Sequence, residues 1–236
     1  MTKFVGMKKK LVVLTGAGVS AESGIKTFRD SDGLWEGYDV MEVASPEGWR
    51  ENPALVLDFY NQRRKNAAAV IPNAAHTGLA ALEDDFDVTI ITQNIDDLHE
   101  RGGSTKVIHL HGEIFKMRSE RSLRPSYEIR ENINIGDFAP DGGQLRPDIV
   151  WFGEAVPKIT EAIDIAAKAD IFVVVGTSMA VYPAAGLIDV VPAQSPKIVI
   201  DRRIPAIRPM QNLITIEKPA TLGVQELKQI LKERYL

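Results

Sequence analysis

The apolar positions near the start of the chain form one short block that is followed by small and polar residues. Leu11 to Leu14 are consecutive aliphatic residues, and Thr15 ends the block before Gly16-Ala17-Gly18. A continuous apolar run of this length predicts a strand that is buried on both faces. The two glycines predict a sharp turn, and the small residues that follow from Ser20 predict the start of a helix.

Similar apolar runs recur along the chain between stretches with helical spacing. From Pro53 to Val70 apolar residues return every three or four positions, which predicts an amphipathic helix after the Asn52-Pro53 start signal. Further helices are expected from Pro46, over 74–82, after Asp97, over 159–169 and over 224–234. Further strands are expected over 88–91, 106–110, 148–152, 171–175, 197–200 and 213–216.

Strands that alternate with helices predict an α/β fold with a mostly parallel sheet and helices on both of its faces. One segment does not fit this alternation. Residues 119–144 are polar, show no clear period and include Pro125, Gly136 and Pro140. We expect this segment to form a small inserted module.

The composition is that of an ordinary globular protein, with 44% hydrophobic and 25% charged residues among 236. A formal net charge of -4 gives no reason to expect a nucleic-acid partner. No apolar run is long enough to span a membrane, and Lys8 to Lys10 are followed by too few apolar residues for a secretory signal. We therefore expect a cytoplasmic protein with no membrane partner. Because the chain has no cysteine, disulfides, thiolate zinc sites and cysteine nucleophiles are excluded.

Polar and small residues gather after the expected strands, where a parallel sheet binds its ligands. These residues are Gly16, Gly18, Gln93, Asn94, Asp96, His111, Gly176, Thr177, Ser178 and Asp201. Gly16-x-Gly18-x-x-Ala21 also fits a dinucleotide fingerprint with alanine in the third place, although an ordinary strand-to-helix turn would look the same. A dinucleotide fold should reach a second strand with a terminal acid about 20 residues later. This chain instead continues with an aromatic, glycine-bearing loop that begins at Thr27, which we expect to close over a ligand and exclude water.

Five motifs occur in the order of one known family. They are GAGVSAESGIKTFRD, TQNIDDLHERGG, HLHGE, LRPDIVWFGE and GTSMAVYPAA. On these motifs the chain resembles the sirtuins, which are NAD-dependent protein lysine deacylases, from about Lys10 to its end. The segment FYNQRR resembles the class III branch, which carries a Tyr-x-x-Arg pattern.

The resemblance implies a single catalytic domain over 1–236 with NAD as a consumed co-substrate. A Rossmann-like, doubly wound parallel sheet would comprise about 8–35, 72–117 and 146–236. The small inserted module would comprise about 36–71, which is helical, and 118–145. The substrates would be acyl-lysine proteins or peptides, whose acyl group ends on ADP-ribose.

The resemblance also implies the catalytic residues. His111 would be the general base that deprotonates a ribose hydroxyl, and a histidine suits that role near neutral pH. Taken alone, His109 and His111 lie two apart on an expected strand and could equally be a metal pair or two core side chains. Asn94 and Asp96, helped by Gln93, would orient the ribose and hold the carboxamide of NAD. Asp96 or its neighbour could also cap the helix that follows.

Residues that would bind NAD follow from the same motifs. They are Gly16, Ala17, Gly18, Ser20, Phe28, Arg29, Gln93, Gly176, Thr177, Ser178, Asp201 and Ala220. Phe28 and Arg29 belong to the loop that would shield the reacting centre. Asp201 stands where the family often has asparagine, and an acid there can accept hydrogen bonds from ribose hydroxyls.

The resemblance implies two groups of residues that bind the substrate. Phe152, Gly153 and Glu154 would pair with the backbone of the substrate as an added strand. Tyr60 and Arg63, on one helix face, would bind the carboxylate of a succinyl, malonyl or glutaryl group, which makes acetyl the poorer substrate. The alternative for these two is a solvated helix face.

The chain departs from the family at its zinc site. The four cysteines of the inserted module fall on Ser119, Ser122 and positions near Ala139 and Gly142. Hydroxyl and methyl groups do not replace thiolate ligands, so we expect no zinc and no other metal. The module then holds itself by local hydrogen bonds and packing, or is mobile.

Two other functions fit the same residues. A mono-ADP-ribosyltransferase would divert the activated ribose to a protein side chain. A non-catalytic sensor of NAD or ADP-ribose would not need His111, Asn94 and Asp96 together, so their presence argues against it.

Overall fold

The structure is a computed structural model that describes residues 7–26, 34–35 and 37–236. Its main sheet contains six parallel strands in the order β11-β10-β9-β1-β4-β5. These are β1 (Lys10–Thr15), β4 (Asp87–Thr92), β5 (Val107–His109), β9 (Ile171–Val175), β10 (Lys197–Asp201) and β11 (Leu213–Glu217). Strand β1 lies between β4 and β9, so the order reverses beside it as in a doubly wound sheet. The expected α/β fold is confirmed.

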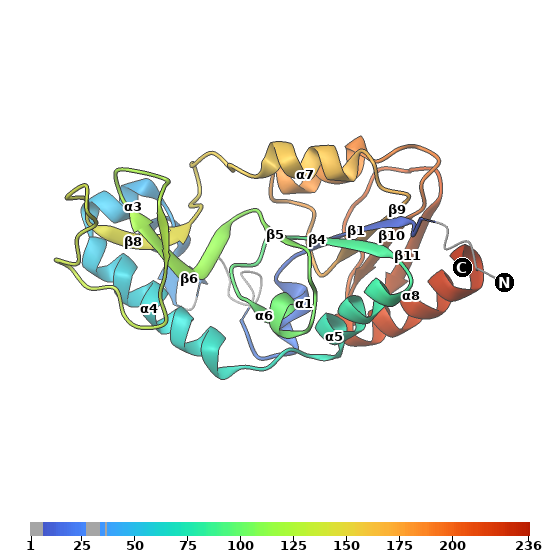
Figure 1. Cartoon of the computed structure of the whole chain (residues 1–236), viewed down its shortest axis with the longest axis horizontal. Coiled ribbons are helices and arrows are strands. Elements are labelled where there is room, and N and C mark those ends of the chain that lie inside the picture. The colour runs from blue at the N-terminus through green and yellow to red at the C-terminus, as the bar shows by residue number, and fades with distance from the viewer. Residues whose placement is uncertain (1–6, 27–33, 36) are drawn as a thin grey trace.

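Alternate residues of β1 belong to two different cores. Leu11 and Val13 pack with α5 (Ala74–Ala80) and α8 (Ala220–Tyr235). Val12 and Leu14 pack with α7 (Ile159–Ala166) and the 3₁₀ helix η2 (Ala184–Val190). Figure 1 shows α7 on one side of the sheet and α5 and α8 on the other. Because both faces are covered, the central strands β1 and β9 each contain an unbroken buried apolar run.

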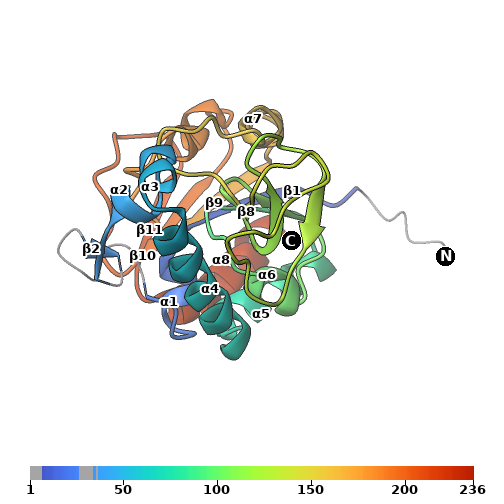
Figure 2. The ribbon, with the colours of Figure 1, turned by 90° about the vertical axis from the view of Figure 1, so that its left-hand side faces the viewer.

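A second group of elements stands beyond the carboxyl ends of the main strands (Figure 1), and Figure 2 shows it from its outer side. We call it the peripheral unit. It contains α2 (Val40–Val43), α3 (Pro46–Glu51), α4 (Pro53–Ala69) and an antiparallel sheet in the order β7-β6-β8. The strands of that sheet are β6 (Gly112–Ser119), β7 (Ser126–Glu128) and β8 (Leu145–Ile149). The remaining short elements are α1 (Gly18–Ala21), β2 (Leu34–Trp35), β3 (Tyr38–Asp39), η1 (Ala81–Asp84) and α6 (Leu98–Arg101).

Two helices of the peripheral unit, α3 and α4, begin where the sequence predicts. The Ser45 side chain accepts a hydrogen bond from Gly48 N, and the Asn52 side chain accepts one from Leu55 N. A proline follows each cap at the first helical position, where the missing N–H has no partner to lose. The apolar faces of these helices enclose a core that includes Phe59.

The polar segment 119–144 is fixed by side-chain hydrogen bonds. Ser119 Oγ donates to Asp141 Oδ1 at 2.8 Å, and Gly143 N donates to the same oxygen at 2.9 Å. Gln144 Nε2 donates to the carbonyl oxygens of Asn134, Asp137 and Leu145. The sequence of this segment shows no period because side-chain hydrogen bonds, together with isolated apolar residues such as Ile133, hold its turns.

The strand expected over 148–152 is displaced in the structure. Strand β8 ends at Ile149, because the next backbone groups bond outside the sheet. Val150 N donates to His111 O, and Phe152 N donates to Ala44 O, each at 2.9 Å. Residues 150–154 are therefore an extended segment and a turn.

Among the described helices, none is long and apolar enough to cross a bilayer.

Candidate active site

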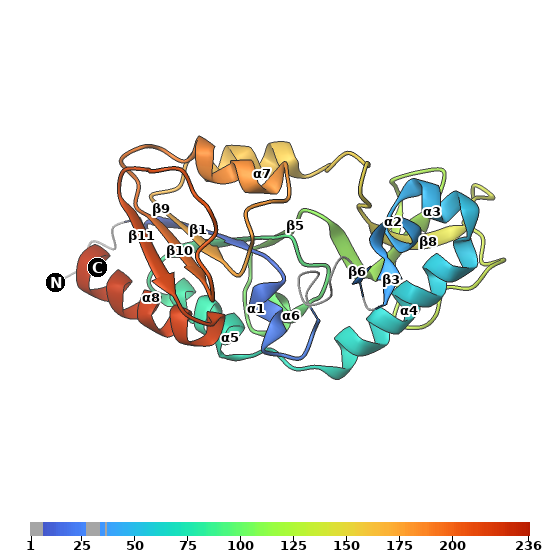
Figure 3. The same ribbon diagram turned by 180° about the vertical axis from the view of Figure 1, so that it is seen from behind.

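A cleft of about 600 Å³ lies between the main sheet and the peripheral unit. Figure 3 shows this part of the molecule from behind, with α1 and α6 between the two parts. A volume of this order is typical of small-molecule and cofactor sites. The sequence-predicted residues that line it are Gly16, Ala17, Gly18, Tyr60, Gln93, Asn94, His111, Phe152, Gly153, Glu154, Gly176, Thr177, Ser178, Asp201 and Ala220.

Three predicted site residues within the described part of the chain do not line this cleft. Ser20 is buried beneath it and bonds other site residues. Asp96 and Arg63 line a second, neighbouring pocket of about 280 Å³. Phe28 and Arg29 lie outside the described residues.

The glycine turn after β1 approaches the turn after β9 very closely. A Cβ on Gly18 would lie 2.7 Å from the Cα of Gly176, and one on Gly16 would lie 2.7 Å from the Cβ of Thr177. Gly18 N also donates to Gly176 O at 2.8 Å. The glycines are therefore required by this contact, which forms one wall of the cleft. Helix α1 spans only four residues, so its dipole contributes little to ligand binding at this turn.

His111 borders the cleft, and within the described residues one of its ring nitrogens has no hydrogen-bond partner. Its Nδ1 lies 3.1 Å from Gln93 O, and since a carbonyl only accepts, Nδ1 carries the hydrogen. Nε2 is then left with a lone pair. Burial lowers the pKa of His111, although the bond to Gln93 opposes this in part, so the ring is neutral near pH 7. A neutral imidazole with an unprotonated Nε2 can act as a general base.

The two histidines expected to point the same way on one strand are separated by the structure. Strand β5 ends at His109, which is 3% exposed and lies behind the cleft wall. His111 lies beyond the strand end and borders the cleft. The two histidines are not a pair on one strand, because the chain leaves the sheet after His109.

Asn94 offers the cleft an acceptor only. Its Nδ2 donates to Gly16 O at 3.2 Å and to Ser20 Oγ at 3.0 Å, which uses both amide hydrogens. Its backbone N donates to Thr92 Oγ1 at 3.0 Å. The side-chain Oδ1 remains available, so Asn94 can receive a hydroxyl or amide hydrogen from a ligand and has none to donate.

Asp96 is held by two donors beneath the cleft. Oδ2 accepts from Ser20 Oγ at 3.1 Å, and Oδ1 accepts from Leu98 N at 3.2 Å. The second bond forms an Asx turn just before α6, whose N-cap residue is Asp97 and has no side-chain capping hydrogen bond. Burial raises the pKa of Asp96, and these two hydrogen bonds oppose the rise.

Glu154 shapes the segment that borders the cleft. Its carboxylate accepts from Arg146 Nη1 and from Trp151 N, both at 2.8 Å. The Arg146 guanidinium also lies 3.1 Å from the centre of the Trp151 ring. The neighbouring Phe152 is 42% exposed, and the space around Gly153 is open. An extended ligand backbone therefore has access to this edge.

Tyr60 and Arg63, which were expected to share one face, border two neighbouring cavities. Tyr60 is fully buried at the cleft wall. Its hydroxyl makes no hydrogen bond of good geometry within the described residues, although the Trp151 side chain is close enough to lower its pKa. Burial raises the pKa of Tyr60 to about 12, against the opposing charge of Arg63. Ile95 borders both cavities, so the two side chains stand on either side of a thin wall.

A family model described as the Sir2 family matches residues 16–183 of the chain. The chain belongs to the Sir2 family. Relatives named NAD-dependent protein deacylase support this. The one from Helicobacter pylori is 52% identical over 225 residues, which cover 95% of this chain and 98% of the relative. The one from Bacteroides thetaiotaomicron is 52% identical over 229 residues, which cover 94% of this chain and 98% of the relative.

Solved structures of Sir2 proteins have the same fold. A Sir2 homologue mutant in complex with ADP-ribose superposes with a TM-score of 0.86 at 37% identity, over 96% of this chain and 93% of that chain. A Sir2 homologue in complex with NAD gives a TM-score of 0.84 at 38% identity, over 96% and 90%. A Sir2 protein bound to acetylated peptide gives 0.78 at 29% identity, over 96% and 93%.

The cleft of this Sir2-family chain also contains residues that the sequence reasoning missed. Arg202 and Arg203 follow β10 directly and line the cleft, and their position after a strand end was the available signal. Trp151 and Val150 line it from the segment after β8. The sequence pattern placed both residues in a strand expected over 148–152, whereas β8 ends at Ile149.

Proposed function

We propose that this Sir2-family protein is an NAD-dependent protein lysine deacylase. One observation carries the proposal: a single cleft brings the free Nε2 of His111 and the acceptor Oδ1 of Asn94 against the turn that contains Gly16 and Gly18. The names of the relatives, and the titles of similar structures with NAD, ADP-ribose or acetylated peptide, support it.

The residues present fit a dinucleotide. The cleft runs along the carboxyl ends of β10, β9, β1 and β4, where an α/β sheet binds such ligands. His111 and Asn94 would face the nicotinamide half, with Asp96 and Ser20 supporting Asn94 from below. The adenosine half would lie toward β9 and β10. Its contacts would be Gly176, Thr177, Ser178, Asp201 and Ala220.

The chain's own groups suit the expected reaction. When bound, NAD supplies a ribose carbon that gives up nicotinamide and accepts the acyl oxygen. His111 Nε2 takes the proton of a ribose hydroxyl, and Asn94 Oδ1 accepts a hydrogen bond that orients the ribose. One water molecule is consumed, and the products are nicotinamide, free lysine and O-acyl-ADP-ribose. The open edge at Phe152 and Gly153 would receive the peptide, with Glu154 holding that edge in shape.

We further propose that the enzyme prefers acyl groups that end in a carboxylate, such as succinyl and malonyl. The support is the buried Tyr60 hydroxyl, which makes no hydrogen bond of good geometry in the described part of the chain, together with the charge of Arg63 close to it. A ligand carboxylate in the cleft could accept a hydrogen bond from the Tyr60 hydroxyl, and the positive charge of Arg63 beyond Ile95 would stabilise it electrostatically. Charge-assisted hydrogen bonds of this kind contribute about 1.5–3 kcal/mol.

The test compares succinyl-lysine and acetyl-lysine peptides, with and without NAD. We expect Arg63→Met and Tyr60→Phe to reduce kcat/KM for the succinyl peptide about tenfold or more and to leave the acetyl reaction largely unchanged. Arg50→Met is the matched control, because Arg50 is an exposed surface residue paired with Glu47. Equal losses on both peptides would refute the acyl preference. Nicotinamide release without deacylation would refute the deacylase and favour ADP-ribosyl transfer.

A further inference from the structure

His109 is a buried histidine whose two ring nitrogens both face acceptors. Nδ1 lies 2.9 Å from the backbone oxygen of Asn94, and Nε2 lies 2.7 Å from Glu100 Oε1. A carbonyl and a carboxylate have no hydrogen to give, so each ring nitrogen must carry one. A histidine protonated on both nitrogens is an imidazolium cation.

From this geometry we propose that His109 is a buried imidazolium that positions Asn94, with Glu100 as its counter-ion. That the position of Asn94 affects catalysis rests on the proposed deacylase function. His109 itself touches no substrate, because its ring lies behind the cleft wall. It acts through the backbone of Asn94 and is therefore a positioning residue.

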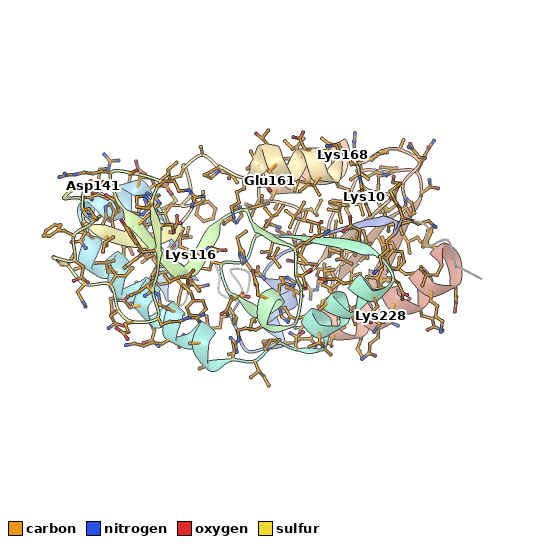
Figure 4. All side chains as sticks on the ribbon, in the orientation of Figure 1. Lys10, Lys116, Asp141, Glu161, Lys168 and Lys228 are labelled. Atoms are coloured by element: carbon orange, nitrogen blue, oxygen red, sulfur yellow. The ribbon has the colours of Figure 1, made fainter. Side chains whose placement is uncertain are left out.

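The groups around His109 favour the positive charge. Glu113 on β6 places Oε1 3.8 Å from Nε2, and its other oxygen pairs with Lys116, which is labelled in Figure 4. Burial alone would lower the pKa of His109, but Glu100, the Asn94 carbonyl and Glu113 together raise it.

Two further titratable groups act on the same ring. Asp96 interacts favourably with the charge of His109, and this lowers the pKa of Asp96 slightly against its burial. His99 on α6 is repelled by His109, and its own pKa lies well below the ordinary value, chiefly because it is buried. A neutral His99 places no second cation beside His109.

A metal ion is the competing occupant. Glu100, His109 and Glu113 offer ligand atoms that lie within 4.8 Å of one another, and they are the one such group found among the residues that the structure describes. A metal would require a lone pair on Nε2, whereas the imidazolium has none. The proton and the metal therefore exclude each other, and an experiment can tell them apart.

The bond from His109 completes the restraint on Asn94. Thr92 holds its backbone N, and Gly16 and Ser20 hold its side-chain nitrogen. The bond to the backbone oxygen is the one restraint in this set that comes from β5. Without it the peptide after Asn94 can rotate, and Oδ1 moves with it.

Two substitutions at His109 remove its hydrogen bonds to Asn94 O and to Glu100 one at a time. His109→Asn places an amide nitrogen near the position of Nδ1, so it can still donate to Asn94 O. His109→Gln places an amide nitrogen near the position of Nε2, so it reaches toward Glu100 and leaves Asn94 O without its donor. We expect His109→Gln to lower kcat for deacylation at least tenfold and His109→Asn to lower it by less than threefold, with similar melting temperatures. Equal losses, or the reverse order, would overturn the positioning role.

Two NMR measurements decide the proposal without relying on activity. In chelator-treated wild-type protein at pH 7.5, two-bond ¹H–¹⁵N correlations should show that both ring nitrogens of His109 are protonated. The same correlations, followed against pH, should show that Glu100→Gln lowers the pKa of His109 by at least one unit. A neutral ring, or a Nε2 that binds added Zn²⁺, would overturn the imidazolium. The ¹³C shift of the Asn94 carbonyl should move in His109→Gln and stay in His109→Asn. If these hold while the wild type fails to deacylate, the proposed function fails and this inference stands.

Discussion

His76 is a histidine that the fold requires to be neutral, and this makes stability depend on pH. It is fully buried in α5, where its Nδ1 accepts a hydrogen bond from Asn73 N at 3.2 Å. Its Nε2 lies 3.4 Å from Ser20 Oγ. A proton on Nδ1 would remove the acceptor that begins α5. Burial accordingly lowers the pKa of His76 from 6.5 to about 4.

The sign and size of the effect follow from proton linkage. The unfolded chain binds this proton below pH 6.5 and the folded chain only below about pH 4, so stability falls as pH drops through that window. These two values give a loss of about 2 kcal/mol from His76 between pH 7 and pH 5. The full loss, reached below pH 4, is about 3 kcal/mol.

Urea unfolding followed by tryptophan fluorescence at pH 7 and pH 5 measures this loss. His76→Asn is the matched variant, because its amide oxygen can accept from Asn73 N but does not titrate in this range. We expect the wild type to lose about 2 kcal/mol more than the variant between the two pH values. Carboxylates and the neighbouring His99 are present in both proteins, so their effects largely cancel in the difference. Equal losses in the two proteins would refute the reasoning.

Three further predictions concern other parts of the site. Gly18→Ala should destabilise the protein by about 1–3 kcal/mol in the same urea assay and weaken NAD binding, because its Cβ would meet the backbone of Gly176 at 2.7 Å; unchanged NAD affinity by calorimetry would contradict this. Asp141→Ala, at the position labelled in Figure 4, should speed proteolytic cleavage within 120–143, because it removes the acceptor of Ser119 Oγ. A chelator should change neither the cleavage rate nor the activity of the wild type. Chelator sensitivity would show that a metal holds the segment. Glu154→Gln should raise KM for the peptide about tenfold and leave KM for NAD unchanged, and equal changes in both would contradict its role at the peptide edge.

The fold could be predicted from the sequence because buried strands and helix ends each require particular residue types over a few neighbouring positions. Strands β1 and β9 are covered on both faces, so each appears as an unbroken apolar run. The caps at Ser45 and Asn52 are likewise local, since the donor lies within three residues of the acceptor. The line of polar residues after the strands followed from the parallel arrangement, and most of them do border the cleft.

The segment 119–144 and the turn after β8 were not accessible in this way. Their shape depends on Ser119 meeting Asp141 and on Glu154 meeting Arg146, and neither contact produces a hydrophobic period. Arg63 shows the same limit, because helical spacing placed it beside Tyr60, while the wall near Ile95 puts the two in different cavities.

The amino-acid order by itself determined the parallel sheet, the glycine turn and the residue types that gather at its edge. Only the tertiary structure decided the protonation state of each of these side chains. His109 and His111 are alike in sequence, yet one faces a carboxylate and a carbonyl while the other faces a carbonyl and the cleft. The physical reason is that a protonation state depends on partners within hydrogen-bond distance. Such partners come from distant parts of the chain, as when Ser20 meets Asp96, 76 positions away.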